Sequence, residues 1–167
     1  MKSIFKLFVA AFLTVAPLTA TAQSNVAHIN VQQLISEMPE VIAAQNELAK
    51  LEKDYTTQID NAFKEFQTKA QSYSSDAANQ TDVTNQARQK ELESMQTNLQ
   101  EFRDSAAQEL QKKQMDLMTP LLEKARNAIT KVGEEQGFNY VIDSSPNGGI
   151  ILANGKDLLS DVKKELG

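Results

Sequence analysis

Apolar residues recur every three or four positions over most of this chain, with charged and amide residues between them. In the first half of the chain the steps of three and four residues repeat every eleven residues. Such a repeat has about 3.67 residues per helical turn and is typical of a nearly straight helix. After Pro39 no glycine or further proline occurs before residue 75, so the pattern predicts one helix over 39–75. Its stripe consists of Leu48, Leu51, Tyr55, Ile59, Ala62, Phe66, Ala70 and Tyr73.

A second stripe predicts a second long helix from about Asp82 to Gln136, with Gly137 as its C-terminal cap. The small polar run 74–82 between the two helices predicts the tip of a hairpin. At 1.5 Å per residue the helices would be roughly 55 and 80 Å long, and their stripes can pack as an antiparallel pair. The second stripe consists of Leu92, Met95, Leu99, Phe102, Ala106, Leu110, Leu117, Leu121, Ala125, Ile129 and Val132.

The two ends of the chain contain short strands. The stretch 26–31 alternates apolar and polar residues, and Asn30 with Gln33 forms a capping-box pattern for a short helix. Near the other end we expect a strand over 138–143, a turn over 144–149, a returning strand over 150–153 and a last helix over 156–166. The sequence therefore predicts an α+β, mostly α fold. Residues 23–38 and 115–167 form a small β-rich body, and 39–114 form the projecting helical hairpin with its tip near 74–82.

The predicted body is too small to be stable alone. Without the base of the second long helix it has about 50 residues and three strands, and such a sheet is marginal without further packing. Its strands are also too apolar for a sheet with one face in water, so we expect partner subunits to cover them. The residues predicted to form the oligomer contacts are Val26, Ile29, Phe138, Tyr140, Val141, Ile142, Ile150, Ile151 and Leu152.

The first 22 residues have the pattern of a secretory signal peptide. Lys2 and Lys6 precede an apolar run over 7–16, and small residues at Ala20 and Ala22 predict cleavage after Ala22. The run is shorter than the roughly 20 apolar residues that span a bilayer, although an uncleaved anchor is the alternative interpretation. The chain has no cysteine, which excludes a lipid-modified lipoprotein and a disulfide framework.

Charge and composition exclude several functions. The full chain carries a formal charge of −5, and removal of Lys2 and Lys6 leaves −7, whereas nucleic-acid binding needs a basic face. His28 is the only histidine, too few for a metal site of the usual His and Cys type, and Ser144 and Ser145 have no nucleophile motif. We therefore expect no catalytic residue, no metal and no cofactor, and predict that the protein is not an enzyme.

The segments VAHINVQQLISEMPE and FNYVIDSSPNGGIILANGKDLLSDVKKEL, with the signal peptide and the long hairpin, resemble the Skp/OmpH family of periplasmic chaperones. The resemblance covers essentially all of the mature chain. It implies a homotrimer whose hairpins surround a central cavity like tentacles. It also implies an ATP-independent holdase that keeps unfolded outer-membrane proteins from aggregating in the periplasm.

Near the tip, two helices cannot fully cover their wide side chains, and Phe63 widens the stripe further. The predicted client-binding residues are Tyr55, Phe63, Phe66, Tyr73, Leu92, Met95, Leu99 and Phe102. Adaptable aromatic and methionine side chains suit many unfolded sequences, but packing within the hairpin's own seam is the alternative for each residue.

The charge of the chain departs from the family's pattern. Well-studied members are basic, whereas residues 51–103 carry six basic and nine acidic residues here, so the sequence does not support membrane-surface or lipopolysaccharide contact. The alternative function is a structural coiled-coil hairpin that acts as an adaptor or spacer of the cell envelope. The small, polar tip SSDAANQTD favours the chaperone.

Overall fold

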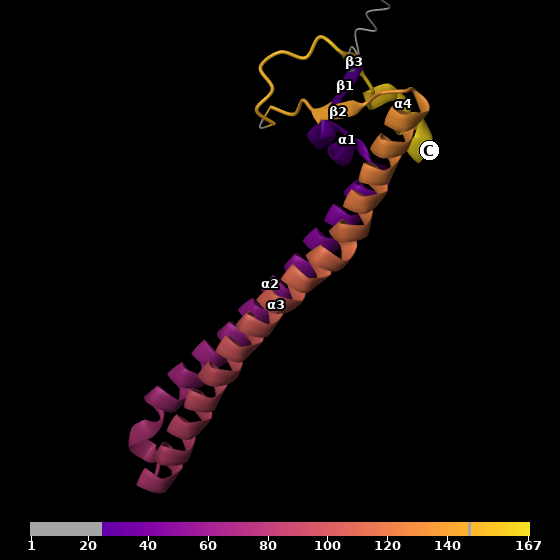
Figure 1. Cartoon of the computed structure of the whole chain (residues 1–167). Helices are drawn as coiled ribbons and strands as arrows, with labels where there is room; N and C mark the ends of the chain where they lie inside the picture. Colours follow the sequence, from indigo (N-terminus) through magenta and orange to yellow (C-terminus); the bar gives the residue numbers. More distant parts are fainter. Residues whose placement is uncertain (1–24, 147) are drawn as a thin grey trace, which may run out of the picture.

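The computed structural model describes residues 25–146 and 148–167 as a long helical hairpin that projects from a small body (Figure 1). The predicted signal peptide and its cleavage site lie outside these residues. The element order is β1, α1, α2, the short 3₁₀ helix η1, α3, β2, β3 and α4. The mostly helical α+β class is confirmed.

The hairpin consists of α2 (Pro39–Ser75) and α3 (Asp82–Glu135), joined at the tip by η1 (Ala77–Asn79). Pro39 opens α2, where its missing N–H costs nothing. The Thr81 side chain caps the start of α3 by accepting from the N–H of Thr84. Gly137 has a φ of +73° just past the end of α3, a conformation that glycine adopts without strain. The two predicted long helices are thus confirmed to within one residue.

Three parallel strands form the sheet of the body, in the order β2-β1-β3. The central strand β1 (Val26–Ile29) pairs with β2 (Tyr140–Asp143) on one side and with β3 (Lys156–Asp157) on the other. Parallel pairing requires a long crossover between strands, and the whole helical hairpin is the connection between β1 and β2.

Helices α1 (Val31–Glu37) and α4 (Leu159–Leu166) complete the body. Asn30 caps α1, since its side chain accepts from the N–H of Gln33, as the capping-box pattern predicts. In Figure 1, α1 and α4 lie on different sides of the base of the hairpin. The core between these elements joins both ends of the chain to the base of the hairpin; its most deeply buried side chains are Ile29, Leu34, Val41, Leu158 and Val162.

The prediction of a returning strand over 150–153 is wrong. This segment forms no strand, and the third strand is instead β3, so that the predicted last helix begins at Leu159 rather than at residue 156. Strand preference depends on the surface against which a residue packs, and this segment has little such surface within its own chain. Gly155 makes the alternative possible, because a Cβ there would lie 2.6 Å from the Val26 carbonyl oxygen.

The predicted β-hairpin is also wrong. A strand over 138–143 that turns back into a strand over 150–153 would pair with it in antiparallel fashion. In the structure, β2 and β3 do not pair with each other; both pair with β1 and run parallel to it. The predicted strand over 138–143 corresponds to β2, which begins at Tyr140 rather than at Phe138. Short apolar runs indicate strands but not their partners, because pairing over long distances in sequence is decided by tertiary packing.

Candidate functional site

Polar contacts between α2 and α3 set the register of the hairpin. The residue numbers of the contact pairs add up to 160 or 164 along the whole length, as expected for two antiparallel helices without a slip. The contact pairs are Glu40–Lys124, Glu47–Lys113, Tyr55–Glu109, Lys69–Glu91 and Asp76–Arg88. They are exposed or only partly buried, so their main effect is to favour one register.

The apolar seam of the hairpin is thin. Within α2 the buried residues are Val41 and Ala44, both close to the body. In the part of α3 that faces the rest of α2, the buried residues are Leu99 and Ala106. The other large seam side chains are only half-buried. Two helices alone leave one side of each wide side chain near water. The sequence predicts this incomplete cover near the tip, and the structure extends it to most of the hairpin.

The structure divides the eight predicted client-binding residues. Phe63 is the one exposed residue of the set, with 40% of its surface accessible. Its ring is stacked on that of Phe66 at 6.5 Å between centroids. Leu99 is buried, and the remaining members are half-buried in or beside the seam: Tyr55, Phe66, Tyr73, Leu92, Met95 and Phe102.

The two tyrosines of this set are held by carboxylates of α3. The hydroxyl of Tyr55 donates to Glu109, and its ring contacts that of Phe102 edge-on at 6.0 Å. The hydroxyl of Tyr73 donates to Glu91 at 2.6 Å. Each hydrogen bond favours the neutral phenol and raises the pKa of its tyrosine. These side chains therefore belong to the seam that holds α2 against α3.

The tip is fixed by a polar cluster. Arg88 donates to Asp76 at 3.0 Å, and its guanidinium carbon lies 4.7 Å from the centre of the Tyr73 ring. The hydrogen bond from Arg88 lowers the pKa of Asp76 below its ordinary value. Asn85 on α3 donates to the carbonyl of Ala77 at 2.9 Å. The run that looks featureless in sequence thus has a defined structure, although Val83 beside it is exposed.

Two grooves lie along the middle of the hairpin and differ in chemistry. The charged groove is lined by nine residues of which seven carry charge, including Asp54, Glu109 and Lys112. The aromatic groove, nearer the tip and about 440 Å³ in volume, is lined by seven residues of which only Arg103 is charged. Arg103 lies over the Phe63 ring at 6.0 Å. Gln96 and Gln100 also line the aromatic groove. The sequence analysis did not predict Gln96, Gln100 or Arg103 as site residues. Their spacing of four and three residues along a helix could have indicated that they share a face.

The body exposes a second apolar surface, which we call the body patch: Tyr140, Ile142, Ile150, Ile151 and Leu152. Ile151 is fully exposed and Leu152 is 75% exposed. The patch combines the segment 150–152 with β2, which is an edge strand. Four other residues that the sequence assigned to oligomer contacts are placed differently. Ile29 is part of the core, Phe138 and Val141 pack against it, and Val26 is half-buried.

Polar residues at β1 and at the end of β2 form hydrogen bonds within the body. His28, half-buried, forms a hydrogen bond of 3.1 Å with the Ser144 hydroxyl. Asp143 accepts from the N–H groups of Val31 and Ser145, and the hydrogen bond from the Ser145 hydroxyl lowers its pKa. No group of three or more metal-ligating residues occurs in 25–146 or 148–167. Within the same ranges, no helix combines the length and apolar character needed to cross a membrane.

Comparison with known proteins defines the class. The family model described as "Outer membrane protein (OmpH-like)" matches residues 25–166, and the chain belongs to this family. The chaperone protein Skp of Yersinia enterocolitica is 24% identical over 159 residues, covering 92% of this chain and 93% of that protein. The crystal structure of a putative outer-membrane chaperone (OmpH-like) from Caulobacter crescentus has the same fold. Its TM-score is 0.76 at 12% identity, over 87% of this chain and 85% of that one. The resemblance drawn from the two ends of the chain is therefore confirmed.

Proposed function

We propose that this protein is an ATP-independent holdase of the periplasm that binds unfolded outer-membrane proteins and prevents their aggregation. Membership of a family of outer-membrane chaperones supports this function. The observation that carries it is the thin seam, which leaves apolar side chains of a long rod only half-covered. A surface of this kind binds extended apolar segments at many points without a fixed partner sequence.

The functional unit in this proposal is a homotrimer. Residues 23–38 and 115–167 form the trimer body, and residues 39–114 form the hairpin that projects from it, after export and cleavage behind Ala22. The body patch supports this assembly, because exposed apolar surface of this kind on a small body marks an interaction site. Three hairpins around one axis would enclose a space in which several half-covered seams act together.

The test is light scattering of a urea-denatured outer-membrane β-barrel protein, diluted with and without the mature chain and without nucleotide. A holdase suppresses the rise in scattering at about one trimer per client. Unchanged scattering with several clients, from protein shown to be folded by circular dichroism, would refute the proposal. That result would favour the alternative, an envelope adaptor or spacer that docks through its tip, where Val83 is 76% exposed.

A further inference from the structure

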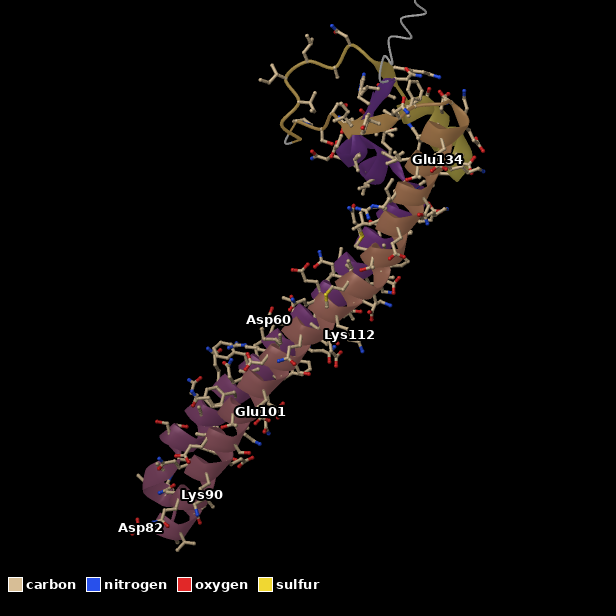
Figure 2. The ribbon with its side chains drawn as sticks, viewed as in Figure 1. Asp60, Asp82, Lys90, Glu101, Lys112 and Glu134 are labelled. Atoms are coloured by element: carbon tan, nitrogen blue, oxygen red, sulfur yellow. The ribbon has the colours of Figure 1, made fainter. Side chains whose placement is uncertain are left out.

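The charged and aromatic grooves open on opposite sides of the hairpin. Asp54 and Phe63 are nine residues apart on α2, about 2.5 turns at 3.6 residues per turn, and therefore point in opposite directions. Arg103 and Lys112 are related in the same way on α3. Asp54 and Lys112 line the charged groove, whereas Phe63 and Arg103 line the aromatic groove. Figure 2 shows Lys112 and other charged side chains on the hairpin.

The side that carries the aromatic groove, which we call the amide flank, continues toward the body. A spacing of 18 residues is about five full turns, so residues at this spacing lie on one line along a helix. Gln45 is 18 residues before Phe63, and it lines a further groove with Val31 and Ile35 of α1. On α3 the same spacing relates Gln96 to Gln114.

The glutamines of the amide flank are available to a ligand. Gln45, Gln96 and Gln114 are exposed, and in the part of the chain that the structure describes their side-chain amides form no hydrogen bond. A primary amide offers two donors and an acceptor. An unfolded polypeptide has the complementary need, because its backbone N–H and C=O groups lack the partners that they have in a folded protein.

We propose that the amide flank binds extended segments of unfolded polypeptide through two kinds of contact. Glutamine amides pair with the client's backbone, and the exposed Phe63, backed by Phe66, receives an apolar side chain. The proposal rests on the holdase function and adds what that function recognises, namely unpaired backbone next to an apolar residue.

A partner helix is a poorer fit to this flank. A helix that docks along a rod needs apolar contacts every three or four residues. Among the described residues of α2, the exposed large apolar side chains are Ile42 and Phe63, 21 residues or about 32 Å apart. A flexible chain can bridge that distance with its backbone on Gln45 and on Gln114, which faces residues 46–50 of α2 in this register.

The test compares two double variants of the full mature protein. Gln45→Glu with Gln96→Glu places two carboxylates, which accept but do not donate, on the amide flank. Gln58→Glu with Gln108→Glu makes the same change on the other side. Residues four positions apart lie on the same face of a helix, and Gln58 is four positions from Asp54 and Gln108 four positions from Lys112, both of which line the charged groove. Glutamine and glutamate have similar helix propensities, so both variants should retain the wild-type helicity and melting temperature.

Binding is measured by fluorescence anisotropy of a dye-labelled outer-membrane β-barrel protein kept unfolded in dilute urea. We expect about tenfold weaker binding by the amide-flank variant, as the loss of one or two net hydrogen bonds implies, and wild-type binding by the control variant. Equal affinities of the two variants, whether both reduced or both unchanged, would overturn the inference. Wild-type protein that fails to bind would refute the holdase function itself.

Discussion

The substitution Ile151→Asp tests the assembly of the body. Ile151 is the most exposed large apolar residue in the described chain, and Leu152 next to it is 75% exposed. Full burial of an isoleucine side chain contributes about 1.5–3 kcal/mol. A trimer that buries three copies therefore gains roughly 5–9 kcal/mol from this position alone, which corresponds to roughly a 10³- to 10⁶-fold change in the association constant. A buried aspartate would add a desolvation penalty.

The assay is size-exclusion chromatography with multi-angle light scattering over a range of protein concentrations. We expect the wild-type mature chain to have the mass of three protomers and Ile151→Asp to have the mass of one. Val83→Asp is the matched control, because it places the same charge on another exposed apolar residue at the far end of the hairpin. The control should remain trimeric.

Two results would refute the reasoning. A wild-type chain that is monomeric at all concentrations would show that the body patch is not an oligomer contact. An Ile151→Asp variant that dissociates at the same concentration as wild type would show that the segment 150–152 stays in water in the assembly. A dissociated variant that loses helicity would indicate instead that the hairpin depends on assembly for its folding.

Three further predictions concern the hairpin and the body. Leu99→Ala removes a buried side chain of the thin seam and should lower the stability by about 2–4 kcal/mol in urea denaturation, whereas Ala62→Ser, exposed in the same hairpin, should change it little. Gly155→Ala would place a Cβ against the Val26 carbonyl and should lower the melting temperature of the body by an amount equivalent to about 1–3 kcal/mol; an unchanged melting temperature would contradict the proposed role of Gly155. The pKa of Asp76 is lowered in the folded protein by the hydrogen bond from Arg88, so its contribution to stability is present above the pKa of the unfolded chain and is lost as the pH falls through the folded value. The protection factors of amides at the tip, which are exchange rates corrected for the intrinsic effect of pH, should therefore fall in acid, and Asp76→Asn should remove that dependence.

The helical hairpin could be predicted closely because its signals are local. An eleven-residue repeat, a proline at the start of α2 and Gly137 after α3 each act through the helix that contains them. The capping of α1 by Asn30 was predicted for the same reason. Each of these features holds whatever the helix packs against, so one sequence was enough to find them.

The body was predicted less well because its signals depend on distant partners. The run 150–153 has the composition of a strand but little surface within the subunit on which to pack. The pair Lys156–Asp157 has no strand signal, and it becomes β3 because Gly155 brings the backbone against β1. Likewise, the apolar pattern could not show that Tyr55 and Tyr73 belong to the seam. The side chains that hold them, Glu109 and Glu91, lie across the hairpin and are not part of that pattern.

The hairpin is held together by polar pairs and by an apolar seam. This combination explains how a thin pair of helices can be ordered and still keep apolar surface available for binding. In the proposed function the apolar side chains of the seam bind the client, and a seam held by apolar burial alone would have to cover them. In this chain, polar pairs such as Glu47–Lys113 fix the register without consuming apolar surface. The half-covered seam and the glutamines of the amide flank then remain available. A more apolar seam would give a more stable hairpin but a poorer chaperone, so variants that tighten the seam should gain thermal stability while their affinity for unfolded clients falls.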